Sequence, residues 1–140
     1  MIKLYSPEQL NLLVTMGLVV LIWIVQIIHY PSFLYYSKED FSEGMISHQR
    51  SISFITLPLM MTELFLTCFI FYKTPNIYSS LGMSLVILIW LSTFYIQVPL
   101  HKKLLTGKDL TLIEKLIRTN WIRTIMWTLK LLLLLIFPYL

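Results

Sequence analysis

Charged residues are scarce in this chain: Asp, Glu, Lys and Arg make up only 13% of its 140 residues, whereas 57% are hydrophobic. A soluble domain carries about twice that charged fraction, so the composition favours a membrane protein. Cysteine occurs once, at Cys68, which excludes a disulfide within the chain. The net charge of +4 comes from basic residues gathered near a few loops, so we expect no nucleic-acid partner.

Long apolar runs, in contrast, fill most of the chain. They cover about residues 10–28, 52–71, 81–98 and 122–139. Each run is close to the ~20 residues that cross the hydrocarbon core of a bilayer. The first run lacks the small-residue cleavage site of a signal peptide, so we expect it to be retained. The sequence predicts an all-α fold: residues 1–140 form a single four-span transmembrane domain, a four-helix bundle within the lipid bilayer.

Basic residues are distributed unequally between the two ends of these spans. The side opposite the termini carries most of them, in the two longer loops and their flanks: Lys38, Arg50, Lys102, Lys103, Lys108, Lys115, Arg118 and Arg123. The side of the termini has only Lys3 and Lys73. By the positive-inside rule we expect a bacterial inner-membrane protein with both termini outside and the two long loops in the cytoplasm.

Both predicted cytoplasmic loops contain segments typical of helix N-termini. SKED (37–40) and TGKD (106–109) each place an acidic residue three positions after a hydroxyl-bearing cap. We therefore expect the second and fourth helices to begin in the cytoplasm and run unbroken into the membrane, with a kink at Pro58. The two caps lie about half a chain apart, and QIIHYP (26–31) is similar to QVPLH (97–101). These similarities suggest a duplicated helical hairpin.

Polar residues recur at helical spacing near the predicted cytoplasmic ends of the spans. Gln26 and His29 share one face of the first helix, and Gln97 and His101 share one face of the third. Because polar groups within a span usually face the bundle interior, we expect them to converge on one cytoplasm-facing pocket. The candidate pocket residues are Gln26, His29, Tyr30, His48, Gln97, His101, Asn120, Arg123 and Trp127.

The chemistry of this pocket has more than one interpretation. His29, His48 and His101 could ligate a metal ion, or the first and last could be axial haem ligands. Alternatively, His29 and His101 could simply cap helix C-termini, since their spacing matches no dense metal-binding motif. Arg123, with Asn120, could hold an anionic oxygen of a substrate or a lipid phosphate. Further candidates for substrate or anion binding are Gln26, Gln97, Tyr30 and Trp127.

Glu63 and Lys130 are charged residues deep within predicted spans. Their distances from the ends of their helices place them at the same level of the membrane. A buried ion pair would satisfy both charges. The alternative is a proton-coupling role for the Glu63 carboxylate.

Several short stretches resemble a known family. They are HYPSF (29–33), SHQRSI (47–52) followed by LPLMMTE (57–63), QVPLHKKL (97–104) and RTNWIRTIMWT (118–128). In these stretches and in its layout, the chain resembles small four-helix bacterial membrane proteins of unknown function and, more distantly, the anthrone-oxygenase-like membrane family. Fungal members of the latter are implicated in oxidising polycyclic phenols. The resemblance puts Pro31, Pro99, His101, Asn120 and Arg123 at matching positions, with His101 where that family is expected to have an amide.

Together these features predict a small membrane protein whose pocket binds a metal ion or haem and acts on a hydrophobic quinone- or phenol-like molecule. Two alternatives stay open. One is a small proton-coupled transporter that works as a homodimer and uses Glu63. The other is a non-catalytic accessory subunit whose cytoplasmic helices dock a partner. The residues do not decide whether the protein is an enzyme.

Overall fold

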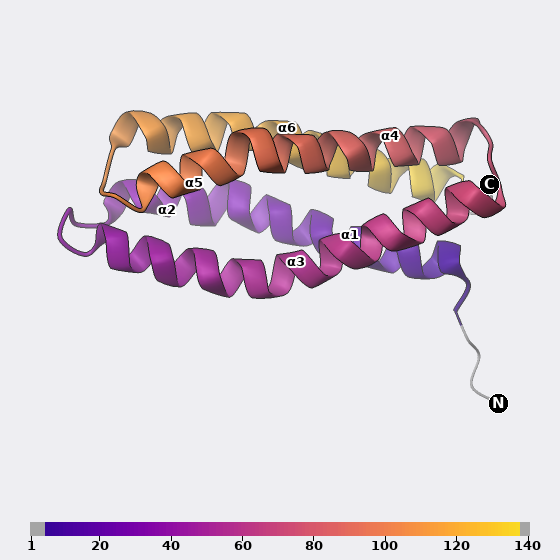
Figure 1. The fold of residues 1–140 in the computed structure, drawn as a ribbon, viewed down its shortest axis with the longest axis horizontal. Coiled ribbons are helices and arrows are strands. Elements are labelled where there is room, and N and C mark those ends of the chain that lie inside the picture. The colour runs from indigo at the N-terminus through magenta and orange to yellow at the C-terminus, as the bar shows by residue number, and fades with distance from the viewer. Residues whose placement is uncertain (1–4, 138–140) are drawn as a thin grey trace.

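The computed structural model of the protein describes residues 5–137 and is a bundle of four long helical rods (Figure 1). The rods are Pro7–Tyr35, Phe41–Lys73, Ile77–Leu104 and Leu110–Ile136. Each is long and apolar enough to cross a membrane. The prediction of an all-α, four-span bundle is therefore confirmed.

Two of the rods are continuous α-helices and two are composite. The second rod is α3 (Phe41–Lys73), and the fourth is α6 (Leu110–Ile136). The first consists of α1 (Pro7–Ile24), the π-helical segment η1 (Val25–His29), α2 (Tyr30–Ser32) and the 3-10 segment η2 (Phe33–Tyr35). The third consists of α4 (Ile77–Ser92), the π-helical segment η3 (Thr93–Gln97) and α5 (Val98–Leu104).

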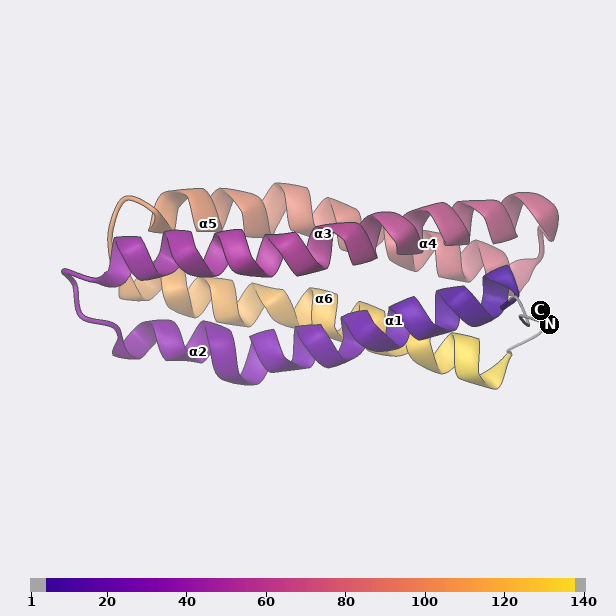
Figure 2. The ribbon, with the colours of Figure 1, turned by 90° about the horizontal axis from the view of Figure 1, so that it is seen from below.

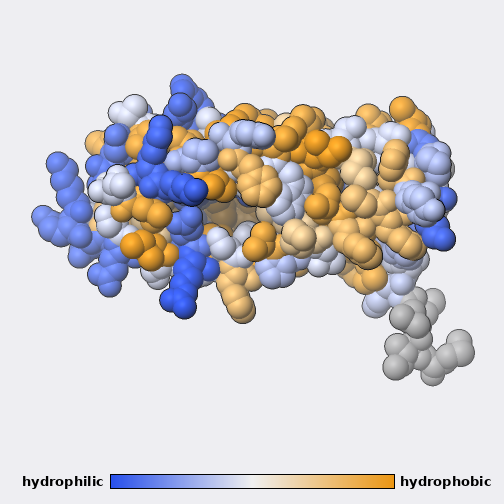
Figure 3. Space-filling model, in the orientation of Figure 1, coloured by the Kyte–Doolittle hydropathy of each residue, from blue (hydrophilic) through white to orange (hydrophobic). Residues whose placement is uncertain are grey.

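The rods pack as a four-sided bundle. α1 packs against α3 and α6, and α4 packs against the same two helices. The start of α1, the end of α6 and the turn between α3 and α4 lie at one end, which we call the terminal end (Figures 1 and 2). The loops before α3 and before α6 lie at the other end, the loop end. Hydrophilic residues gather densely at the loop end, whereas apolar side chains cover the middle of the bundle (Figure 3).

The first and third rods continue past Pro31 and Pro99, beyond the ends of the apolar runs at about residues 28 and 98. Each proline lies two residues after the end of its π-helical segment, η1 or η3. In a regular α-helix the proline ring would clash with the carbonyl four residues earlier. A π-helical turn inserts one residue and displaces that carbonyl, so the rod continues with a local distortion. Both halves of the chain use this device, in keeping with the suggested duplication.

The helices of the loop end begin close to where the sequence predicts. Ser37, the predicted cap, closes a turn before α3, in which the Asp40 amide donates to Ser37 Oγ at 3.1 Å, whereas Asp40 is the N-cap residue and makes no side-chain capping bond. α6 is capped by Asp109, which accepts from the Leu112 amide at 3.1 Å. The Thr106 hydroxyl, the predicted cap, donates instead to the Lys103 carbonyl. α3 bends near its middle, in the stretch that holds Pro58 (Figure 1).

One lysine fastens the two loops of this end together. Lys108 Nζ donates to the carbonyl oxygens of Leu34 and Tyr36, each at 2.7 Å. These carbonyls lie at the C-terminal end of the first rod, where a cation is favoured by the helix dipole. The segment before α6 is thereby held against the end of η2.

Candidate functional site

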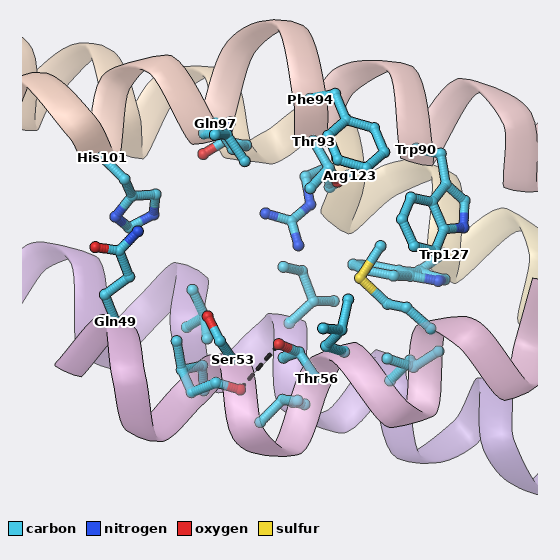
Figure 4. Close-up of a pocket in the computed structure, with 18 of the residues that line it drawn as sticks. Gln49, Ser53, Thr56, Trp90, Thr93, Phe94, Gln97, His101, Arg123 and Trp127 are labelled. Carbon is cyan, nitrogen blue, oxygen red and sulfur yellow. Dashed lines mark hydrogen bonds between the residues drawn. The ribbon is translucent and has the colours of Figure 1, made fainter. Parts of the chain in front are cut away.

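A cavity of about 200 Å³ lies between α3 and the composite rod α4–η3–α5, with α1 and α6 behind it (Figure 4). We call it the Arg123 cavity. Its walls are mostly apolar, and residues of all four rods contribute to them. The lining residues used below are Leu18, Met60, Trp90, Gln97, His101, Arg123 and Trp127.

The Arg123 cavity opens sideways, toward the surface that lipid would cover. Two of its lining residues, Leu57 on α3 and Phe94 on η3, have 53% and 57% of their surface exposed. On the face seen in Figure 3 the surface is hollowed between α3 and the α5 rod. Both residues belong to the predicted apolar spans, so the opening lies at the level of the hydrocarbon and not of the loops.

Arg123 extends from α6 into this cavity (Figure 4). It is only 7% exposed, and its guanidinium lies over the Trp127 ring, 5.2 Å from the ring centroid. Nη1 donates a long hydrogen bond of 3.4 Å to Asn120 Oδ1, while Nε has no partner. Among residues 5–137 the ion pairs within 4.0 Å do not include Arg123. A buried charge of this kind favours an anionic or strongly polar oxygen beside it.

Two further polar groups face the same cavity without satisfied partners. His101 Nε2 and the Tyr30 hydroxyl are 2.9 Å apart, which leaves His101 Nδ1 buried and unpartnered. Gln97 Nε2 donates to Thr119 Oγ1 at 3.2 Å, and Gln97 Oε1 is likewise unpartnered. The cavity therefore offers a cationic donor at Arg123, an amide acceptor at Gln97, and an imidazole nitrogen whose role depends on its tautomer.

Gln26 and Asn120, predicted as pocket residues, instead fasten the first rod to α6. Asn120 Nδ2 donates to Gln26 Oε1 at 2.9 Å, and Gln26 Nε2 donates to the Ile117 carbonyl at 3.0 Å. Thr124 Oγ1 also donates to Gln26 Oε1, at 3.3 Å. Since Asn120 Oδ1 in turn accepts from Arg123, this cluster orients the guanidinium rather than lining the cavity.

The three predicted histidines contact different neighbours. His29 and His48 face each other with ring centroids 5.2 Å apart, and the Tyr30 ring lies 6.4 Å from His48. His101 is hydrogen-bonded to the Tyr30 hydroxyl, with the two ring centroids 5.5 Å apart. Within the described part of the chain, no group of three or more His, Cys, Asp or Glu side chains is placed to hold one metal ion. A metal or haem site at these histidines stays a prediction that this arrangement does not favour.

Glu63 and Lys130 form the buried ion pair that their levels in the sequence indicate. Lys130 Nζ is 2.8 Å from Glu63 Oε1, and the two side chains are 0% and 1% exposed. The ammonium also donates to Thr67 Oγ1 at 3.0 Å and to Asn11 Oδ1 at 3.3 Å. Glu63 Oε1 accepts from Thr15 at 3.0 Å, and Oε2 accepts from Trp127 Nε1 at 3.0 Å. Both charges are thus paired and fully hydrogen-bonded, as a low-dielectric interior requires.

Several residues of the Arg123 cavity and of the environment of the Glu63–Lys130 pair were not predicted from the sequence. Gln49, Ser53 and Trp90 line the Arg123 cavity without having been predicted there. For the first two a signal exists, because together with Thr56 they recur at helical spacing along one face of α3. Asn11, Thr15 and Thr67, which complete the environment of the ion pair, are single polar residues within apolar runs, a pattern that carries little information by itself.

Comparisons of the chain with known proteins found no similar protein. No protein-family model matches the chain, and neither the curated proteins nor the solved structures give a match. What the fold and the site define is thus a class: an all-α bundle with four helices able to span a membrane. The family resemblance of the short sequence stretches stays a prediction.

Proposed function

We propose that the Arg123 cavity binds a lipid-soluble molecule whose polar head is a single ring bearing an anionic or carbonyl oxygen, as in a phenol or a quinone. The observation that carries this proposal is the Arg123 guanidinium. It is buried, has no carboxylate partner among the described residues, and points into a cavity that opens at hydrocarbon level. A ligand arriving from the membrane would supply the missing oxygen.

The size of the cavity supports a head of one ring. An apolar protein cavity of roughly 150 Å³ accommodates benzene, and the Arg123 cavity measures about 200 Å³. A ring with small substituents fits this volume, while an aliphatic tail would leave through the gap beside Leu57 and Phe94. Three fused rings would extend beyond the enclosed space.

The polar groups suggest how the head would lie. A ring oxygen would accept from Arg123 Nε, and a hydroxyl or hydroxyl-like group would donate to Gln97 Oε1. The Tyr30–His101 pair, 2.9 Å apart, could exchange a proton with the bound ring. Trp127, held beneath the guanidinium, would stack against or border the ring. The alternative of a non-catalytic accessory subunit predicts a collapsed pocket. An open, partly polar cavity therefore favours ligand binding over that alternative.

We further propose that the loop end faces the cytoplasm of a bacterium and that the bundle resides in its inner membrane, with both termini outside. The support is the excess of Lys and Arg in and beside the two loops of that end. In this orientation the Arg123 cavity lies in the cytoplasmic half of the bilayer.

The test is a ligand titration followed by tryptophan fluorescence, because Trp90 and Trp127 line the cavity and quinones quench indole emission. Protein in neutral-lipid nanodiscs is titrated with an alkyl-tailed benzoquinone. Arg123→Met should weaken binding by about 1.5–3 kcal/mol, the value of a hydrogen bond to a charged group, which is a roughly 10- to 150-fold rise in Kd. Arg118→Met, which removes an exposed charge from the same helix, is the control and should leave the Kd unchanged.

Two results would contradict the proposal. Equal Kd values for the native protein and Arg123→Met would show that the guanidinium does not hold the ligand. If the benzoquinone fails to bind in neutral-lipid nanodiscs, while phosphatidylglycerol binds to the native protein but not to Arg123→Met, Arg123 is a lipid-phosphate anchor instead.

A further inference from the structure

A second cavity, of about 190 Å³, lies at the terminal end of the bundle and is separate from the Arg123 cavity. We call it the Lys130 cavity. Glu8 and Gln9, in the first turn of α1, are at its outer part, and Lys130 is at its inner part beside Asn11 and Thr67. All four rods contribute to its wall, so it lies along the axis of the bundle. Its polar outer residues and its position suit it to contain water from the terminal side.

On each of three helices, the residues that line the two cavities are seven or eight positions apart, which is about two helical turns. On α1, Asn11 lines the Lys130 cavity and Leu18 lines the Arg123 cavity, with buried Thr15 between them. On α3 the corresponding sequence is Thr67, Glu63, Met60, and on α4 it is Gly82, Val86, Trp90. We call the residues between the cavities the ion-pair layer: Thr15, Glu63, Val86, Trp127 and Lys130.

The Glu63 carboxylate connects a residue that lines one cavity with a residue that lines the other. Lys130 lines the Lys130 cavity, and Trp127 lines the Arg123 cavity. Glu63 accepts from Lys130 Nζ at 2.8 Å and from Trp127 Nε1 at 3.0 Å. Val86 is fully buried, and so are Thr15, Trp127 and Lys130. The layer is therefore densely packed, yet it contains charged and polar groups at a depth where apolar residues would cost less free energy to bury.

We infer that the two cavities are the halves of one path along the bundle axis, closed in this structure by the ion-pair layer. The Lys130 cavity would be the half that water enters from the terminal end, and the Arg123 cavity the half that opens to lipid. The path does not depend on which ligand the Arg123 cavity takes.

The first test measures proton leak through the bundle in liposomes that contain a pH-sensitive dye and have their membrane potential clamped. The double variant Glu63→Ala/Lys130→Ala removes both charges and leaves a void between the cavities. The matched control, Glu63→Gln/Lys130→Met, removes the same charges but keeps the layer filled. We expect a several-fold rise in proton leak for the Ala/Ala variant, and for the control the low leak of the native protein. Equal leak from two folded variants would overturn the inference.

The second test uses the native ion-pair layer and so does not depend on the folding of the Ala/Ala variant. Gly82→Cys and Val86→Cys are made in a Cys68→Ser background and treated in liposomes with a water-soluble, membrane-impermeant thiol reagent. A side chain at Gly82 meets only Leu133 Cδ2, at 3.9 Å, so the new thiol fits there. We expect Gly82→Cys to react and Val86→Cys, one turn deeper, to be protected. An unreactive Gly82→Cys would show that water does not reach the cavity, and a reactive Val86→Cys would show that the layer does not seal it.

Discussion

Removing Lys130 should destabilise the bundle far more than removing Lys130 and the charge of Glu63 together. In Lys130→Met the Glu63 carboxylate keeps its hydrogen bonds from Thr15 and Trp127 but loses the one counterion that it has among residues 5–137. Both side chains of the pair are essentially inaccessible to solvent, so water cannot replace the ammonium. Breaking a buried pair by removing one partner costs about 3–5 kcal/mol. We expect the free energy of unfolding of Lys130→Met to fall by that amount.

The double variant Glu63→Gln/Lys130→Met should recover most of this loss. Its glutamine oxygen can still accept from Trp127 and Thr15, and its methionine fills the space of the lysine stem. Replacing a buried ion pair by neutral groups of similar volume is often close to neutral, so we expect stability within ~1–2 kcal/mol of the native protein. Glu63→Gln alone leaves the ammonium uncompensated and should resemble Lys130→Met.

The assay is reversible unfolding in mixed micelles, with rising mole fractions of a denaturing detergent and far-ultraviolet circular dichroism as the readout. The native protein, both single variants and the double variant form a double-mutant cycle. A loss below ~1 kcal/mol for Lys130→Met would mean that the carboxylate finds water or a proton without penalty. A double variant no more stable than either single variant would refute the pairing argument itself.

Two further predictions concern contacts that join the rods. Gln26→Leu leaves the Asn120 amide without its acceptor and should cost about 1–3 kcal/mol of unfolding free energy, part of which Gln26→Leu/Asn120→Leu should restore. The same unfolding assay checks this, and equal losses in both variants would contradict it. Lys108→Met removes two hydrogen bonds to the Leu34 and Tyr36 carbonyls at a partly exposed site. It should cost only ~1 kcal/mol but speed amide exchange locally in residues 36–40, and unchanged exchange there would argue against the contact.

Features set by local sequence were predictable, and features set by helix rotation were not. The four spans follow from the length of apolar runs, and α6 begins close to the predicted cap, although Asp109 and not Thr106 is the capping residue. That α1–η1–α2 passes Pro31 as one rod depends on an inserted π-helical residue, which no propensity indicates. Sequence spacing correctly placed Arg123 on the interior face of α6, but could not show that His101 is hydrogen-bonded to Tyr30. Helix rotation is decided by packing between rods, for which a single sequence holds no direct signal.

The π-helical segments also determine which residues form the cavity. Each adds one residue to its rod, and one residue turns the remainder of a helix by about 100°. Tyr30 follows η1, Gln97 is the last residue of η3, and His101 follows η3. The direction in which each of these side chains points around its helix is therefore set by the inserted residue. Deleting one residue from η1 would turn Tyr30, and deleting one from η3 would turn His101, by about 100° out of the present direction and leave the terminal half of that rod undisturbed. In this bundle the terminal half and the loop half can therefore change separately, because a single-residue insertion in each of two rods divides them.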